Sequence, residues 1–241
     1  MLSTLSDLYI VIPARNEEQS IVNLIPQLKL KTKNILIVDN NSTDDTYRVA
    51  KEAGVYVIKE NNIGYGSACL ASIKYLNQLD QKPKFICFFD GDGQSRVKDI
   101  DRIALPVLAN ITVYCQGSRM SLIKSKMALS PLAQVANKIF SIILILSFQQ
   151  KITDLGPLRV MTWEFLKSLD MRSKGYGWTI EMSSKLLKMR VAHLEIPVQY
   201  QERKEGKSKI SGQINTAIMA AIVMLLTYLY VFFLWKPNRT K

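Results

Sequence analysis

The sequence predicts an α/β protein with a mostly parallel sheet and helices on both of its faces. Over the first 116 residues, short β-rich apolar runs alternate with longer helical patterns, and no internal repeat interrupts them. The chain has 241 residues, of which 48% are hydrophobic, so it can bury a large core, which excludes a disordered chain. Its three dispersed cysteines lack CxxC spacing and fit a reducing compartment better than a disulfide framework.

Five short apolar runs have the continuous hydrophobicity of strands that are buried on both faces. The predicted strands are residues 9–12, 35–38, 55–58, 85–89 and 111–115. Between them lie four stretches of helical periodicity, the second of which ends at Gly54. The predicted helices are residues 17–28, with Asn16 as cap, 44–53, 67–79 and 97–108, the last broken by Pro106. This alternation implies βαβ units and therefore parallel strands.

Polar segments lie at or near the carboxyl ends of the first four predicted strands. The four polar segments are residues 13–17, 39–42, 61–64 and 90–94. In open α/β sheets, ligands bind outside the carboxyl ends of the strands. We therefore expect these segments to meet at one rim of the sheet and to form the functional site.

The segment Asp90-Gly91-Asp92-Gly93-Gln94 carries the most specific chemistry. Two carboxylates two residues apart, with a glycine between them that permits a tight turn, can both face a hard divalent cation. Oxygen ligands favour Mg²⁺ or Mn²⁺ carrying a diphosphate, and the Gln94 amide could supply a third oxygen. A polar turn and a phosphatase that uses the two aspartates are the alternatives.

Other polar positions have more general interpretations. Asp39 ends the second predicted strand and could accept hydrogen bonds from a nucleobase imide or a ribose hydroxyl. Asp44 and Asp45 are assigned to capping the helix that follows. Residues 62–68 form a glycine-containing loop that enters a helix, where backbone N–H groups can approach a nucleotide. The single histidine, His193, lies in a strand-like run over residues 191–197, and we assign it a structural role.

The net charge of +12 is unevenly distributed along the chain. Beyond Asp101 there are 20 Lys and Arg residues but 7 Asp and Glu residues, and no acidic residue lies between Asp101 and Asp154. A basic half beside a hydrophobic tail favours anionic lipid headgroups over nucleic acid as the partner.

Residues 216–235 form an uncharged hydrophobic segment of twenty residues, rich in aromatic side chains toward its end. A helix of this length can cross a hydrocarbon core of about 30 Å, and terminal aromatics followed by basic residues are typical of a membrane interface. We therefore predict a domain over residues 1–212 and a membrane-associating or transmembrane helix with a basic tail over residues 213–241. The alternative is a buried core helix. Residues 139–148 are apolar but too short to span a bilayer, so we assign them to the core.

Six motifs lie along the chain, at residues 10–18, 38–44, 90–94, 117–119, 176–181 and 203–209. Together they resemble family 2 inverting glycosyltransferases, most closely the polyprenyl-phosphate (dolichyl-phosphate) sugar transferase branch. They follow the order of that family, and the resemblance extends over residues of about 8 to 212. It implies a GT-A fold (the Rossmann-like fold of nucleotide-diphospho-sugar transferases), a UDP- or GDP-linked sugar donor, and Mg²⁺ or Mn²⁺ as cofactor.

The resemblance also implies roles for individual residues. The nucleotide-binding residues would be Pro13, Arg15, Glu17, Asp39 and Asp90. The metal ligands would be Asp90, Asp92 and Gln94. Acceptor or phosphate binding would fall to Arg119, Glu181 and Ser208, and catalysis to Asp92, Asp154, Arg203 and Lys209.

The implied activity is transfer of a hexose, with inversion, to a polyprenyl phosphate at the cytosolic face of a membrane. A phosphate monoester has a second pKa of about 6, so it is largely ionised at neutral pH and needs little general-base assistance. The alternative acceptor is a hydroxyl group of a glycolipid or small molecule, which would require Asp154 or Glu181 as base. A non-catalytic nucleotide-sugar-binding or membrane-scaffold protein is a more remote alternative.

Overall fold

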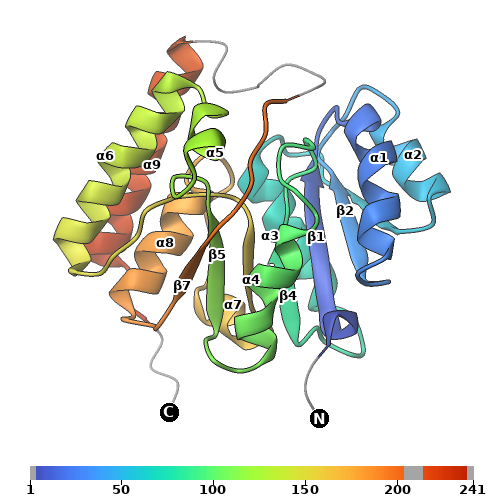
Figure 1. Ribbon diagram of the computed structural model, residues 1–241, viewed down its shortest axis with the longest axis horizontal. Helices are drawn as coiled ribbons and strands as arrows, with labels where there is room; N and C mark the ends of the chain where they lie inside the picture. Colours follow the sequence, from blue (N-terminus) through green and yellow to red (C-terminus); the bar gives the residue numbers. More distant parts are fainter. Residues whose placement is uncertain (1–3, 204–213, 238–241) are drawn as a thin grey trace.

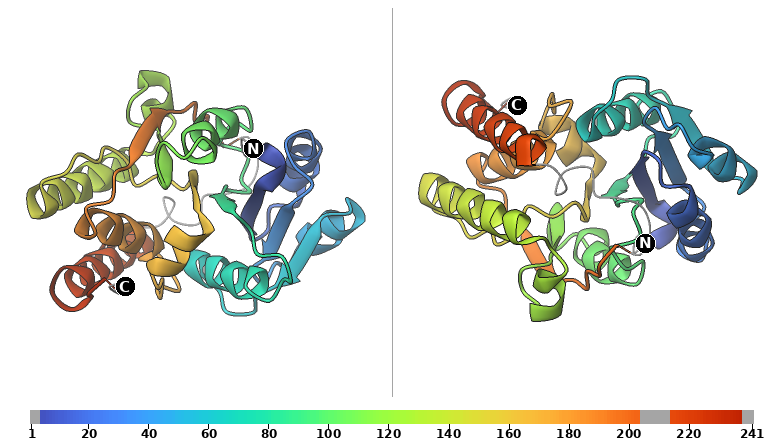
Figure 2. Two further views of the ribbon diagram at one scale, coloured as in Figure 1. Left: turned by 90° about the horizontal axis from the view of Figure 1, so that it is seen from below. Right: turned by 90° about the horizontal axis from the view of Figure 1, so that it is seen from above.

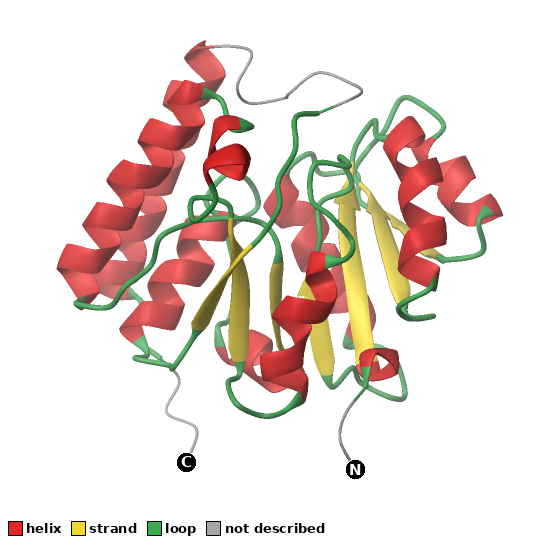
Figure 3. Cartoon of the chain, viewed as in Figure 1, coloured by secondary structure: helices red, strands yellow, loops and turns green. Residues whose placement is uncertain are grey.

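A seven-stranded mixed sheet with helices on both faces forms the centre of the molecule (Figures 1 and 3). The computed structural model describes residues 4–203 and 214–237. The strands are β1 (Leu8–Ala14), β2 (Ile35–Asp39), β3 (Tyr56–Lys59), β4 (Phe85–Phe88), β5 (Tyr114–Ser118), β6 (Arg159–Thr162) and β7 (Leu194–Pro197). Their order across the sheet is β3-β2-β1-β4-β6-β5-β7.

The first four strands lie where they were predicted, but β3 is not buried as expected: both of its end residues are exposed and the middle two are half-buried. The rest of the sheet does not follow from the prediction. β3, β2, β1 and β4 are parallel, whereas β6 runs antiparallel to both β4 and β5. The strand predicted at residues 111–115 begins instead at Tyr114, because Asn110 adopts a positive φ of 57° and Thr112 bonds the Ala192 carbonyl across 2.7 Å. β7, part of the strand-like run that contains His193, pairs in parallel with β5.

Helices cover both faces of the sheet (Figure 2). The helices before β5 are η1 (Leu5–Asp7), α1 (Glu18–Lys29), α2 (Thr46–Glu52), α3 (Tyr65–Leu76) and α4 (Asp99–Leu108). Those after β5 are α5 (Ile123–Met127), α6 (Pro131–Phe148), α7 (Trp163–Ser168), α8 (Trp178–Lys188), α9 (Ile214–Leu229) and the π-helical turn η2 (Tyr230–Leu234). One core cluster joins the sheet to α1, α2 and α4, and a second joins its other face to α3, α7 and α8. The predicted two-faced covering is therefore confirmed.

Two local predictions need correction. Pro106 does not break its helix, since α4 continues through it and ends two residues later, at Leu108. Near the end of the helix, the missing N–H of proline costs a single backbone hydrogen bond. Asn16 does not cap α1; it has a φ of 52°, and its side-chain oxygen accepts from the Thr43 backbone N–H across 2.8 Å. The first turn of α1 is bonded instead by Asp44, which also accepts from the Thr46 N–H at the start of α2. The capping role predicted for Asp44 is thus present. Asp45 occupies the N-cap position of α2, but its side chain accepts from Arg48 and caps no helix N–H.

A third apolar cluster lies at the end of the molecule that carries α6, α8 and α9 (Figure 1). Phe140 and Leu144 of α6 and Tyr228 of α9 pack with Ile180 and Leu187 of α8. Both α6 and α9 retain exposed apolar side chains on their other faces. On α6 these are Leu132, Val135, Ile139, Ile142 and Leu146, and on α9 they include Ile218, Met219, Ile222, Leu225 and Leu226.

Two helical segments in the part of the chain that the structure describes are long and apolar enough to cross a membrane. They are residues 131–148 and 215–234. The segment predicted at residues 139–148 is therefore part of a longer helix than expected, with one face in the core and one exposed. A core helix of a soluble protein can be equally long and apolar. The solvent exposure of the apolar side chains therefore says more about membrane contact than length and composition do.

Candidate functional site

The predicted metal-binding aspartates lie at the carboxyl edge of the sheet, directly after β4. Gly93 has a φ of +72°, a conformation that favours glycine, and the turn brings the Gln94 backbone N–H to Oδ1 of Asp92 across 3.1 Å. Oδ1 of Asp90 is inaccessible to solvent and makes no hydrogen bond within the described residues. A buried carboxylate oxygen without a donor is costly unless a cation or another ligand completes it.

The electrostatics of Asp90 agree with a cation site. Burial, and after it the negative charge of Asp92, raise the pKa of Asp90 to about 7, although Arg119 and a hydrogen bond from Tyr65 oppose the shift. Two nearby carboxylates disfavour each other's ionised form, and a divalent cation between them removes that repulsion. Within the described residues, no group of three or more His, Cys, Asp and Glu side chains is arranged to hold a metal ion, at this site or at any other. Two carboxylates alone would leave most of the coordination sphere to a ligand such as a diphosphate.

Arg203 joins the aspartate pair to the first motif. Its Nη2 atom lies 3.2 Å from Oδ2 of Asp92 and 3.2 Å from Oε1 of Glu17. Glu17 is held in turn by its backbone N–H, which donates to Oγ1 of Thr46 across 2.9 Å. The structure therefore brings three predicted site residues from the ends of β1 and β4 and from beyond β7 into one cluster.

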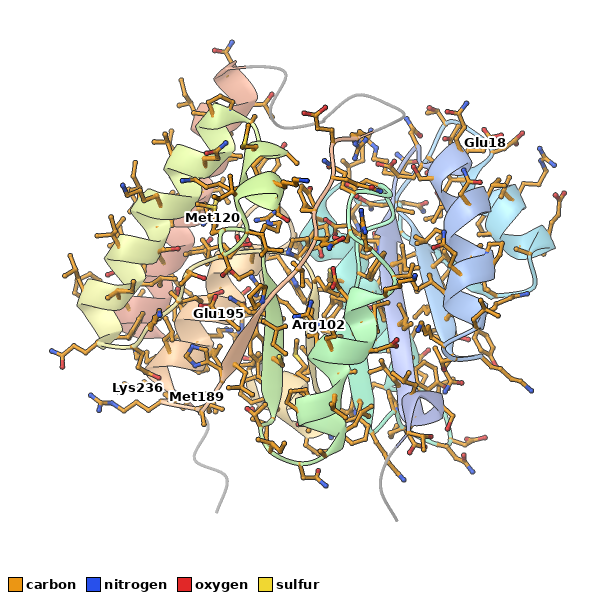
Figure 4. The ribbon with its side chains drawn as sticks, in the orientation of Figure 1. Glu18, Arg102, Met120, Met189, Glu195 and Lys236 are labelled. Carbon is orange, nitrogen blue, oxygen red and sulfur yellow. The ribbon has the colours of Figure 1, made fainter. Side chains whose placement is uncertain are left out.

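Asp154 and Arg119 form a second, buried pair at the same rim. Asp154 is fully buried, and its two carboxylate oxygens accept three N–H bonds of 2.7 to 2.9 Å from the backbone and guanidinium of Arg119. Glu195 of β7 accepts from the backbone N–H groups of Thr153 and Asp154 and so fixes this turn. In Figure 4, Met120, the neighbour of Arg119, lies above Glu195, on the side of the rim. Both Asp154 oxygens are thus engaged.

Tyr200 is a site residue that the sequence analysis did not identify. Its hydroxyl donates to Oε1 of Gln94 across 2.9 Å, and the Arg119 guanidinium lies 5.2 Å from its ring centroid. Burial and the charge of Asp92 raise its pKa, so the hydroxyl stays protonated and donates. The Gln94 amide N–H also donates to the Gln201 carbonyl. The Gln94 oxygen uses one of its two lone pairs to accept from Tyr200. A polar residue three positions beyond the strand-like run at β7 was the available signal.

A cavity of about 640 Å³ adjoins this cluster at Tyr200. Its walls carry the basic side chains Arg96 and Lys124 and the apolar side chains Leu122 and Ile123. Positive charge next to apolar surface suits an anionic group carried on an apolar stem.

The predicted nucleotide side of the site is organised around the end of β2. Asp39 is 4% exposed, and its Oδ1 makes no hydrogen bond within the part of the chain that the structure describes. Its neighbour Asn40 accepts from the Gly64 N–H across 2.7 Å and donates to the Asn62 carbonyl, which holds the glycine-containing loop beside it. Pro13 is paired with Val38 in the β1–β2 register, so Arg15 follows at the same edge.

The remaining predicted residues lie apart from this cluster or outside the described chain. Glu181 is 1% exposed within α8 and bonds the Arg172 and Ser173 backbone N–H groups and the Lys185 ammonium. Its oxygens are therefore engaged in the interior rather than presented at the rim. Ser208 and Lys209 lie outside the described residues.

Comparison with known proteins gives a family and close relatives. The family described as Glycosyl transferase family 2 matches residues 9–157. An uncharacterised protein of Methanocaldococcus jannaschii is 34% identical over 80% of this chain and 81% of its own. A UDP-N-acetylglucosamine–dolichyl-phosphate N-acetylglucosaminyltransferase of Methanococcus voltae is 30% identical over 81% of this chain and 86% of its own. An undecaprenyl-phosphate mannosyltransferase of Micrococcus luteus is 26% identical over 85% of this chain and 87% of its own.

The fold has counterparts among solved structures. Glucosyl-3-phosphoglycerate synthase from Mycobacterium tuberculosis, crystallised with Mn²⁺, UDP-glucose and phosphoglyceric acid, superposes with a TM-score of 0.71. The two chains are 17% identical, and the match covers 97% of this chain and 81% of that chain. This likeness confirms the predicted GT-A fold.

Proposed function

Since the chain belongs to glycosyl transferase family 2, we propose that it transfers a hexose from a UDP- or GDP-sugar to a polyprenyl phosphate, with inversion, at the cytosolic face of a membrane. The observation that carries the donor half is the Asp90–Asp92 pair, with its unbonded buried oxygen, beside Arg203 and Arg119 at the carboxyl edge of the sheet. The acceptor half is supported by relatives named for dolichyl-phosphate and undecaprenyl-phosphate transfer.

We assign Asp90 and Asp92 as ligands of Mg²⁺ or Mn²⁺, with Gln94 offering a third oxygen. The Mn²⁺ and UDP-glucose present in the glucosyl-3-phosphoglycerate synthase crystals support a divalent cation of this kind. When bound, such a cation neutralises the charge that develops on the diphosphate leaving group.

The chain's own residues orient the donor and favour departure of the diphosphate. Asp39 has a buried oxygen free to accept from a nucleobase imide or ribose hydroxyl. Arg203 brings positive charge toward the leaving group, where fixed charges stabilise the transition state more than the ground state. The resemblance assigns a similar role to Lys209, which lies outside the described residues. Attack from the opposite face of the sugar inverts the anomeric carbon.

The state of the two candidate bases favours a phosphate acceptor over a hydroxyl acceptor. Asp154 has both oxygens bonded to Arg119, and Glu181 has both oxygens bonded in the interior. A hydroxyl nucleophile would need a carboxylate with a lone pair directed at the substrate. A phosphate monoester is already ionised, and the basic cavity beside Tyr200 would receive it.

Membrane association is proposed through the exposed apolar faces of α6 and α9. These faces carry large apolar side chains, for example Leu146 at 75% and Leu226 at 61% exposure. Exposed apolar area on this scale is typical of a membrane or protein contact. We retain a C-terminal transmembrane or membrane-associating helix and a cytosolic catalytic domain as the proposed arrangement. Co-sedimentation with anionic vesicles tests it, and a protein that stays in the supernatant would contradict it.

The decisive experiment is a transfer assay with labelled UDP- and GDP-sugars and Mn²⁺ or Mg²⁺. Polyprenyl phosphate is compared with the unphosphorylated prenol of equal length and with phosphoglyceric acid. We expect product with the phosphorylated lipid alone. Product with the prenol alone would replace the proposed acceptor by a hydroxyl group.

A further inference from the structure

A buried ion pair in α8 connects the C-terminal helix to the loop of the proposed donor site. Glu181 and Lys185 are 1% and 0% exposed, and the Lys185 Nζ atom lies 2.6 Å from Oε1 of Glu181. The mechanism proposed above uses neither residue. A buried ion pair is seldom a net source of stability, so the contacts of this pair point to another role.

On one side, the pair fixes the backbone of residues 170–173. The Glu181 carboxylate accepts from the N–H groups of Arg172 and Ser173, the latter across 2.7 Å. Lys185 donates to the Asp170 carbonyl, also across 2.7 Å. Both charged groups therefore bond the backbone of the same loop.

That loop is packed directly on residues 60–67, which comprise the turn after β3 and the first residues of α3. We call this segment the donor loop. The Lys174 carbonyl accepts from the Ser67 N–H across 2.8 Å. A Cβ atom at Gly64 would lie 2.2 Å from the Lys174 carbonyl oxygen, and one at Gly66 would lie 2.0 Å from that of Ser173. A displacement of one loop is transmitted to the other, because their backbones are in contact and no flexible side chain lies between them.

The donor loop in turn reaches the proposed metal and base positions. Its Gly64 N–H donates to Oδ1 of Asn40, the neighbour of Asp39, across 2.7 Å. Its Tyr65 side chain lies close enough to Asp90 to lower the pKa of that carboxyl. A shift of this loop would therefore alter both ends of the proposed nucleotide site.

The same helix, α8, also contacts the end of the C-terminal segment, residues 231–235. The Trp235 ring lies 5.0 Å from Nζ of Lys185, a cation–π distance. Lys188 donates to the carbonyls of Val231, Phe232 and Trp235 across 2.7 to 2.8 Å. Thr227 of α9 packs so closely on Gly177 that a Cβ there would lie 2.4 Å from its hydroxyl.

We propose that Glu181 and Lys185 are positioning residues that hold the donor loop through residues 170–174 and couple its position to the seating of α9 and η2 on α8. This inference rests on the proposed function, since it takes residues 60–67 as part of the donor site. It makes the apolar C-terminal segment a determinant of nucleotide affinity as well as of location.

Two double variants separate positioning from stability. Glu181→Gln with Lys185→Met removes both charges but keeps an oxygen that accepts from Ser173. Glu181→Leu with Lys185→Met removes the charges and the acceptor together. Both avoid an unpaired buried charge, so both are expected to fold, which a thermal melt verifies.

The readouts are hydrogen exchange of residues 60–67 and the affinities for UDP and GDP in the presence of Mn²⁺. We expect the Leu/Met variant to show faster exchange there and about tenfold weaker nucleotide binding, with the Gln/Met variant close to wild type. Wild-type exchange and affinity in a folded Leu/Met variant would overturn the inference. If the wild-type protein binds neither nucleotide, the proposed function fails, while the exchange data still test the coupling.

The C-terminal half of the coupling is tested with Trp235→Leu and, as matched control, Leu234→Ala. Trp235 is 5% exposed to solvent and contacts Lys185, whereas the adjacent Leu234 is 70% exposed. We expect faster exchange of residues 60–67 in Trp235→Leu and wild-type exchange in Leu234→Ala. Unchanged exchange in Trp235→Leu, or an equal effect of both substitutions, would remove the link to the C-terminal segment.

Discussion

Nη2 of Arg203 donates a hydrogen bond to Oδ2 of Asp92 across 3.2 Å, although 111 residues separate them in the chain. The same atom lies 3.2 Å from Oε1 of Glu17. A guanidinium between two carboxylates occupies the region of negative potential where a divalent cation would also be favoured. Arg203 and the cation should therefore compete for Asp92 and then act together on a bound diphosphate.

Substituting Arg203 should have opposite effects on cation binding and on turnover. In Arg203→Met, the affinity for Mn²⁺ without nucleotide should rise about threefold or more, because a competing positive charge is gone. The turnover number should fall by about 10²-fold, because the leaving diphosphate loses a charged donor. Calorimetric titration with Mn²⁺ and steady-state kinetics measure the two effects. A joint loss of both would contradict the competition.

Asp92→Asn should abolish transfer while leaving the fold intact. The substitution keeps the size of the side chain but removes a charge from the proposed cation site, and a loss of about 10²- to 10³-fold or more is expected. The control is Asp80→Asn, at an exposed acid outside the site. Activity assays together with far-UV circular dichroism decide the matter, and wild-type turnover in Asp92→Asn would reject the metal assignment.

The stabilising effect of Mn²⁺ should depend on pH through Asp90. Its pKa is raised from 3.8 to about 7 by burial and by Asp92, so between these values the folded protein binds more protons at this group than the unfolded chain. Its contribution to stability therefore decreases as pH rises through that range. Mn²⁺ replaces the proton, and the upward shift in Tm on adding it should be larger at about pH 8 than at about pH 5.5. Thermal melts of wild type and Asp90→Asn provide the comparison, since the substitution should remove the dependence.

Asp154→Asn should reduce stability as well as activity. Asp154 is fully buried and pairs with Arg119, whose side chain is 14% exposed. Removing one member of a buried pair leaves the other uncompensated, at a cost of about 3 to 5 kcal/mol. Urea denaturation measures the loss of unfolding free energy. Were Asp154 a free general base, the variant would lose turnover with stability nearly unchanged, and the argument for an ionised acceptor would weaken.

The parallel half of the fold was predictable from the sequence because each of its strands is a continuous apolar run. Phe85–Phe88 and Ile35–Asp39 are buried along their whole length, so every position had to be apolar or placed at the end. β6 was not predictable in this way, because Arg159–Thr162 begins with a buried arginine and ends with threonine, so it is not a continuous apolar run. Its antiparallel pairing with β4 and β5 arises from contacts far apart in the chain.

The candidate site divides in the same manner. Asp90, Asp92 and Asp39 were identifiable because a polar residue directly after a buried strand must lie at the carboxyl edge. The roles of Tyr200 and Asn40 could not be identified from the sequence, because each acts through a partner distant in the chain. Tyr200 bonds Gln94, and Asn40 bonds Gly64.

The sequence by itself determined that this chain is an α/β glycosyltransferase-like protein with paired aspartates at a sheet edge and an apolar C-terminal segment. Local patterns suffice for these features, since periodicity and strand-end position are properties of neighbouring residues. Only the tertiary structure decided what Asp154 and Glu181 do, because the availability of a carboxylate depends on which donors surround it. In both cases those donors bond both carboxylate oxygens: Arg119 for Asp154, and Arg172, Ser173 and Lys185 for Glu181.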